Sequence, residues 1–170
     1  WVTDRLNHRV LRFDNASSKL SSSNADGVLG QPDFTSNTAG TTAGLLSAPT
    51  SLFVDGSGNL WVADKDNNRV LRFNNASTKP NGSNADGVLG QVDFVSTTSG
   101  TSASTMDAPW GVHVDVSGKL WVADRFNSRV LRYDNASGLA NGSVANGVLG
   151  QTDFVSSTSG LSQSKFDGPR

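Results

Sequence analysis

Apolar and polar residues form a pattern that recurs three times along the chain. Each copy opens with a short apolar run that contains a tryptophan, passes through a polar segment with Asp and Asn, and ends in a second apolar run. The copies occupy residues 1–13, 61–73 and 121–133, so the period is 60 residues. A fixed period of this size indicates an array of repeated units. Apolar runs of about five residues, rich in Val, Leu and aromatics and bounded by Asp and Asn, predict a hairpin in each copy.

The middle unit shows the whole repeat most clearly. Strands are expected at 51–55, 60–64, 69–73 and 88–94, with a tight turn at 56–59, a polar loop at 75–87 and a Ser/Thr/Gly-rich linker at 95–108. Apolar residues fall on both faces of the second strand, so something is expected to pack on each side of the sheet. Four short strands followed by a connector predict one blade of a β-propeller.

The repeated segment resembles the NHL repeat, whose pattern runs from a proline through W-V-A-D-x-x-N-x-R-V. It is found at 49–70 (PTSLFVDGSGNLWVADKDNNRV) and 109–130 (PWGVHVDVSGKLWVADRFNSRV), and its second half begins at Trp1. The following VLGQxDF segment is similar to bacterial members of the family. The resemblance implies an all-β propeller of four-stranded antiparallel blades, with six blades in the complete ring.

The chain is expected to supply eleven strands, or about three blades. We therefore expect a single NHL domain or half-propeller, with units at 1–60, 61–120 and 121–170. An arc of three blades leaves two blade faces exposed. Each exposed face lacks hydrophobic burial that would contribute on the order of 8 kcal/mol to stability. Either a homodimer that closes a six-bladed ring or a longer parent chain is expected to cover them.

Composition narrows the function classes. The chain has 170 residues, a formal net charge of −1 and no cysteine, and all of its acidic residues are Asp. The basic footprint of a nucleic-acid-binding protein is missing, as are the thiols of a disulfide scaffold or a thiolate metal site. No apolar run is long enough to cross a membrane. A composition rich in Ser, Thr, Asn and Gly and poor in Lys favours an extracellular, cell-surface or periplasmic location.

An Asp and an Arg five residues apart recur at the turn of every hairpin. A ring of carboxylates could bind a cation, but a feature that repeats in every unit favours a scaffold role in which each Asp accepts backbone hydrogen bonds and pairs with its Arg. The predicted structural residues are Asp4, Asp64 and Asp124 with Arg9, Arg69 and Arg129.

Metal and catalytic chemistry have little support in the sequence. The turn after Asp55 resembles a calcium loop, but the next unit places Lys119 and Phe126 at ligand positions. The two histidines, His8 and His113, lie in different units and are too few for a zinc site. No catalytic residue, metal or cofactor is therefore predicted. The N-x-S sequons, Asn81 and Asn141 among them, are equally explained by turn chemistry.

Positions that differ between near-identical units are the candidates for ligand contact. They fall in the turns between the second and third strands and just after the linker prolines, which a propeller places on one face around its channel. The candidate residues are Arg5, Leu6, His8, Lys65, Asp66, Asn68, Trp110, His113, Arg125, Phe126, Ser128 and Arg170. The predicted function is a non-catalytic binding or scaffold module that recognises a protein or other ligand through this loop face. The alternatives are a metal-dependent propeller enzyme of the lyase or lactonase type and a structural segment of a longer repeat protein.

Overall fold

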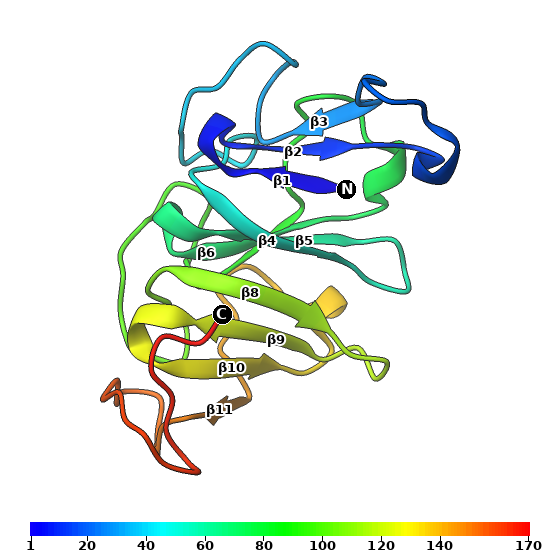
Figure 1. The fold of residues 1–170 in the computed structure, drawn as a ribbon. Coiled ribbons are helices and arrows are strands. Elements are labelled where there is room, and N and C mark those ends of the chain that lie inside the picture. Colours follow the sequence, from blue (N-terminus) through cyan, green and yellow to red (C-terminus); the bar gives the residue numbers. More distant parts are fainter.

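A computed structural model describes all 170 residues and consists of three antiparallel β-sheets packed face to face (Figure 1). The strands of the first sheet are β1 (Val2–Asp4), β2 (Arg9–Arg12) and β3 (Gly27–Leu29). Those of the second are β4 (Pro49–Val54), β5 (Leu60–Asp64), β6 (Arg69–Phe73) and β7 (Gly87–Leu89). Those of the third are β8 (Pro109–Val114), β9 (Leu120–Asp124), β10 (Arg129–Tyr133) and β11 (Gly147–Leu149).

The helical segments are six short 3-10 turns. Three of them join the middle strands of a sheet: η1 (Arg5–Asn7), η3 (Lys65–Asn67) and η5 (Arg125–Asn127). The other three follow the third strand of each unit: η2 (Ala16–Ser18), η4 (Ala76–Thr78) and η6 (Ala136–Gly138). No helix has the length and hydropathy needed to cross a membrane.

Strands that are consecutive in the sequence are neighbours in each sheet. The orders are β1-β2-β3, β4-β5-β6-β7 and β8-β9-β10-β11, and all pairs are antiparallel. The central hairpins have the same register, because Asp64 pairs with Arg69 and Asp124 with Arg129. This arrangement confirms the all-β prediction of propeller-type blades and of eleven strands.

Two predicted strand boundaries are wrong by two or more residues. The first strand of the middle unit begins at Pro49 instead of residue 51, and the outer strand ends at Leu89 instead of residue 94. The outer strand stops because Gly90 takes a positive φ of 86° and turns the chain out of the sheet. The Asp93 carboxylate then accepts the backbone N–H of Ser96, which holds this segment in a local turn.

The hydrophobic core lies between the sheets and not within one of them. Val10 and Leu29 of the first sheet pack against Leu71 and Phe73 of the second. The same pattern recurs one unit later, where residues such as Trp61 pack against the third sheet. The middle sheet contacts a neighbouring blade on each side, and its strand β5 is apolar on both faces, so all five residues of β5 are buried.

The two outermost faces of the stack are open. Leu149 of the third sheet is 50% exposed, whereas Leu89 at the same repeat position is 3% exposed. A depression of about 390 Å³, lined by residues that include Trp121 and Val130, lies on this side. Leu11 and Phe13 line a second depression, of about 520 Å³, on the open side of the first sheet. The open faces therefore expose residues whose equivalents in the neighbouring blade are buried.

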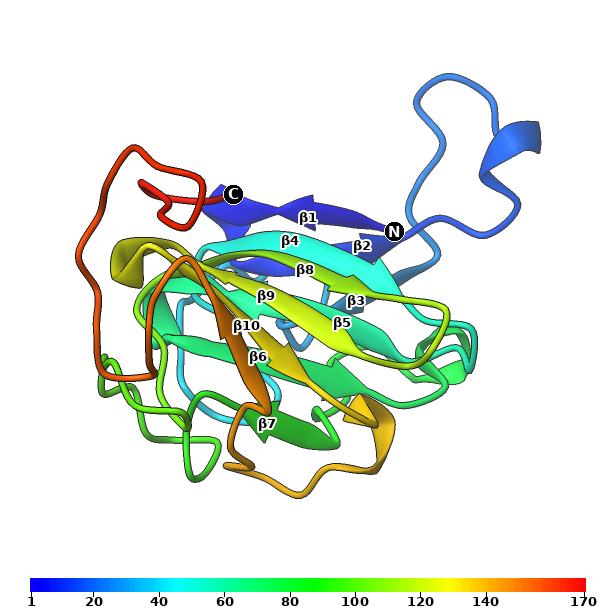
Figure 2. The ribbon, with the colours of Figure 1, turned by 90° about the horizontal axis from the view of Figure 1, so that it is seen from below.

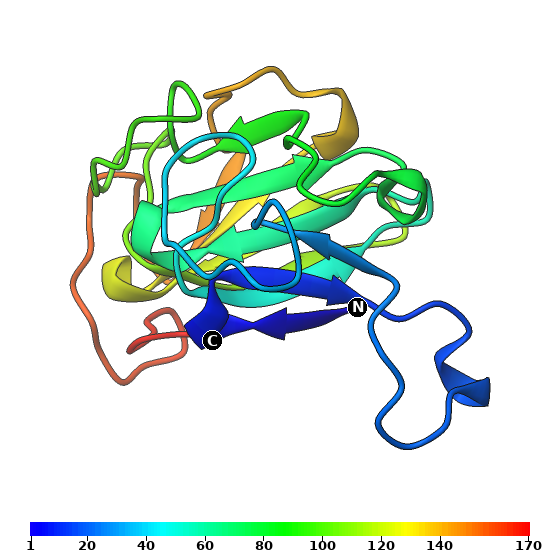
Figure 3. The same ribbon diagram turned by 90° about the horizontal axis from the view of Figure 1, so that it is seen from above.

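Hydrogen bonds across the blade boundaries fix the stack. Asn81 Oδ1 accepts the backbone N–H of Val28 on the outer strand of the preceding blade, and Asn141 does the same for Val88. In the opposite sense, Arg72 donates to the Ser137 carbonyl of the following blade. The loop between β2 and β3 has no preceding blade beside it and projects from the body (Figures 2 and 3). These contacts give two of the sequon asparagines a structural role.

Candidate functional site

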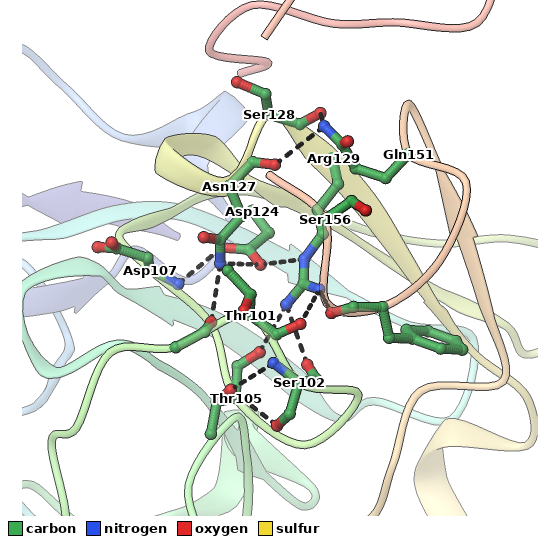
Figure 4. A network of polar contacts seen from close by, with 12 residues as sticks. Thr101, Ser102, Thr105, Asp107, Asp124, Asn127, Ser128, Arg129, Gln151 and Ser156 are labelled. Carbon is green, nitrogen blue, oxygen red and sulfur yellow. Dashed lines mark hydrogen bonds and ion pairs between the residues drawn. The ribbon is translucent and has the colours of Figure 1, made fainter. Parts of the chain in front are cut away.

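The Asp–Asn–Arg set at each hairpin turn is a buried polar network (Figure 4). In the third blade, Asp124 Oδ1 accepts the Asp107 N–H at 2.7 Å, and Oδ2 accepts Asn127 Nδ2 at 2.8 Å and Arg129 Nε at 2.6 Å. The rest of the Arg129 guanidinium donates to the carbonyls of Thr101, Ser102, Thr105 and Phe154. All five guanidinium N–H donors of Arg129 and both carboxylate oxygens of Asp124 therefore have partners inside the protein.

The middle blade repeats this network, and the first blade has a reduced version. The Asp64 and Arg69 side chains are both 0% exposed, whereas those of Asp4 and Arg9 are 26% and 17% exposed. Arg9 donates only to Asp4 and to the Phe34 carbonyl. The difference arises because the linker that passes over Arg69 and Arg129 has no counterpart over Arg9.

Burial raises the pKa of each of these carboxyl groups, and hydrogen bonds and the paired arginine lower it, so the balance differs between blades. Burial raises the pKa of Asp64 and Asp124, although the paired arginines and Asn67 and Asn127 oppose it. Burial is also the largest single influence on the pKa of Asp4. There, however, the hydrogen bonds from Asn7 and Arg9 and the Arg9 charge outweigh it and lower the pKa.

The candidate positions at the ends of the turns are partly structural. His8, Asn68 and Ser128 each follow a 3-10 turn in the left-handed conformation, with φ of 53°, 52° and 50°. His8 Nδ1 accepts the Ala48 N–H at 3.0 Å, and Asn68 Oδ1 accepts the Ala108 N–H at 2.8 Å. These two side chains therefore anchor the linker that enters the next blade.

Four of the candidate residues meet at one point. The guanidinium carbons of Arg125, Arg170 and Arg5 lie 4.5, 5.2 and 5.5 Å from the centroid of the Trp110 ring. Arg5 comes from η1 of the first blade, Arg125 from η5 of the third, and Trp110 from the start of β8. We call this group the Trp110 cluster. A cation within about 6 Å of an aromatic face is attracted to the ring.

The remaining candidate residues do not all lie at the Trp110 cluster. Leu6 and Phe126 occupy one repeat position and are 83% and 59% exposed, beside Arg5 and Arg125 in the sequence. Lys65 pairs with Asp66 and is not part of the Trp110 cluster. His113 lies farther along β8, where its ring packs edge-on against Phe53 with centroids 4.6 Å apart, so it is not a loop-face residue.

The turn that resembles a calcium loop is held by its own hydrogen bonds. Asp55 accepts the backbone N–H groups of Ser57 and Asn59, and its second oxygen accepts the indole N–H of Trp61. Asp115 repeats this arrangement. No group of three or more His and Asp side chains is placed so that it could hold a metal ion.

The glutamine of the VLGQ segment is a residue that the sequence analysis missed. Gln91 is 3% exposed, and its Nε2 donates to the carbonyls of Asn68 and Thr98. Gln31 and Gln151 make the equivalent bonds. The recurrence of this glutamine at the same place in all three units was the available signal.

Comparison with known proteins bears on the repeat itself. No family model matches the chain. The chain is 24% identical over 145 residues to NHL repeat-containing protein 3 of Mus musculus, which is 81% of this chain and 36% of that protein. It is 26% identical over 93 residues to the protein of the same name in Homo sapiens, which is 53% of this chain and 23% of that protein. Similarity to these two relatives supports the NHL pattern that the three units carry. The three units are NHL repeats.

The NHL chain spans well under half of the length of either relative, at 36% and 23%. The names of both relatives describe the repeat and state no catalytic activity. The likeness of the VLGQxDF segment to bacterial NHL proteins stays a prediction.

Proposed function

We propose that this chain is the binding part of a non-catalytic NHL module that recognises a protein partner through its loop face. The observation that carries the proposal is the Trp110 cluster, in which side chains from separate blades gather around one half-buried tryptophan. Exposed Leu6 and Phe126 flank it in the sequence. Tryptophan and arginine are enriched among the residues that contribute most to protein binding, and the contacts around them exclude water.

A selection experiment tests this proposal. A random peptide library is selected on the purified chain, and the affinity of the enriched peptides is measured for Trp110→Ala, Leu6→Ser and Phe126→Ser. The matched control is Val116→Ser, because Val116 is fully exposed on the β8–β9 turn away from η1 and η5. Loss of affinity in the three loop-face variants, with the control unchanged, is expected. Peptides that bind all variants equally would overturn the proposal.

We also propose that the two open faces of the stack are covered by further NHL blades. Support comes from the repeat positions, because Trp121 and Leu149 match Trp61 and Leu89, which are buried against the next blade. The covering blades would come from a second copy of this chain or from further repeats of a longer one. Light scattering separates the sources: a mass twice that of the chain indicates a closed pair. A monomer whose open faces bind no added NHL blades would contradict the proposal.

A metal-dependent propeller enzyme and a purely structural segment remain the alternatives. Neither is favoured by an observation in the described residues. The proposal of a binding face is preferred because the three arginines around Trp110 lie over its ring but make no ion pair or side-chain hydrogen bond, so their N–H donors are free for a ligand.

A further inference from the structure

The three arginines of the Trp110 cluster differ from every other arginine in the chain. Arg9, Arg12, Arg69, Arg129 and Arg132 pair with carboxylates, and Arg72 donates to backbone carbonyls. Arg5, Arg125 and Arg170 make no ion pair and no side-chain hydrogen bond. Their guanidinium groups lie over aromatic rings, over Trp110 in all three cases and, for Arg125, also over Phe126.

The cluster concentrates positive charge at one place. All three guanidinium carbons lie within 5.5 Å of the same ring centroid, so none is more than about 11 Å from another. At that separation, comparable to the Debye length of about 8–10 Å, like charges still repel one another in physiological salt. The Trp110 ring offsets part of this repulsion. An anion between the guanidinium groups would offset more of it, and their unused N–H donors would bind it.

From this geometry we infer that the Trp110 cluster binds carboxylate side chains of an acidic peptide segment in the partner protein. This inference rests on the proposed loop-face function and names the chemistry of its ligand. A guanidinium group presents two parallel N–H donors that match the two oxygens of a carboxylate. Three such groups from separate elements can bind more than one carboxylate of one segment.

The surroundings of the cluster favour a peptide over a nucleic acid. Leu6 and Phe126 offer apolar contact to side chains on either side of an acidic residue. Asp66 occupies the repeat position of Leu6 and Phe126 in the middle blade, and it pairs with Lys65, so the middle blade does not extend the positive charge of the cluster. The whole chain has a net charge of −1, and a phosphate polymer needs an extended basic surface. A short acidic and apolar segment fits both the local charge and its limited extent.

The composition of the selected peptides provides the test. The library selection described above is repeated on Arg5→Gln, Arg125→Gln and the double variant, with Lys119→Gln as control. Lys119 lies on the β8–β9 turn, so this control removes the same charge away from η1 and η5. Peptides enriched in Asp and Glu are expected on the unmodified chain and the control. Each cluster substitution should weaken the best acidic peptide about 10- to 100-fold, as expected when a charged hydrogen bond is lost.

Two further outcomes separate this inference from the proposed function. If the enriched peptides lack acidic residues but still require Trp110, the inference is wrong and the loop-face function stands. If the enriched peptides bind the Trp110→Ala variant normally, both are wrong. Binding of a ten-nucleotide single-stranded oligonucleotide is measured as well. If it binds more tightly than the best acidic peptide and its binding depends on Arg5 and Arg125, the ligand is a nucleic acid and the inference is wrong.

Discussion

Removal of Arg69 should destabilise the protein far more than removal of Arg9, although both arginines occupy the same repeat position. Arg69 is 0% exposed and donates five hydrogen bonds, one to Asp64 and four to the carbonyls of Thr41, Thr42, Leu45 and Phe94. Truncation to Ala leaves the Asp64 carboxylate buried without its counter-charge. Breaking one partner of a buried pair typically costs about 3–5 kcal/mol. We expect about 4 kcal/mol for Arg69→Ala.

The first blade supplies the internal comparison. The Arg9 and Asp4 side chains are 17% and 26% exposed, and Arg9 makes two hydrogen bonds. Solvent screens this pair, so Arg9→Ala should cost only about 1 kcal/mol. The free energy of unfolding is measured by urea denaturation, followed by tryptophan fluorescence. With a slope of about 2 kcal/mol per molar urea, the difference of roughly 3 kcal/mol moves the midpoint by about 1.5 M. Equal losses in the two variants would refute the role assigned to the linker carbonyls.

Three further predictions follow from single contacts. Asn141→Ala should lower the unfolding free energy by about 1 kcal/mol, because the Val88 N–H loses its acceptor. Ser21 occupies the same repeat position but is exposed, so Ser21→Ala should leave the stability unchanged. Equal effects of the two substitutions in urea denaturation would contradict this. Tyr133→Phe should raise stability by about 1 kcal/mol, since the Tyr133 hydroxyl is buried without a partner; a loss of stability would imply an unrecognised bond. Acid should destabilise the fold. Hydrogen bonds from Thr35 lower the pKa of Asp33 to about 2, and bonds from Trp121 and Ser117 lower that of Asp115 below its ordinary 3.8. The unfolded chain then takes up protons first, so the melting temperature should fall as the pH drops from about 4 toward 2, less steeply in Asp115→Asn. A melting temperature that rises on acidification would show that Asp64 and Asp124, whose pKa values are raised, dominate instead.

The 60-residue period made the central hairpins predictable. Short apolar runs and turn residues place β5, β6, β9 and β10 correctly, because both strands of each hairpin lie close together in the sequence. The outer strand was overextended because Gln91 and Asp93 stand within an otherwise apolar run and their side chains bind backbone outside the sheet. The local sequence pattern does not show whether such residues end the strand or belong to the turn after it.

The loop face was predictable in composition but not in arrangement. His8 and Asn68 looked free to vary, yet both supply an acceptor to the next linker, one through Nδ1 and the other through Oδ1. A comparison of the units does not reveal this shared role, because the two residue types differ although both accept the same backbone hydrogen bond. The meeting of Arg5 with Trp110 joins two blades far apart in the sequence, so it depends on how the blades stack. The repeat pattern of the sequence does not predict this contact.

Trp110 gathers three guanidinium groups without ion-pair partners on the loop face. The most direct measurement is the proton NMR spectrum of the arginine side chains, recorded for the unmodified chain and for Trp110→Leu. Protons of Arg5, Arg125 and Arg170 lie over the indole face, so its ring current should shift their δ-methylene signals upfield. All three shifts should vanish together in Trp110→Leu while the Arg69 signals stay in place. Arginine signals that do not respond to Trp110→Leu would show that the cluster does not form.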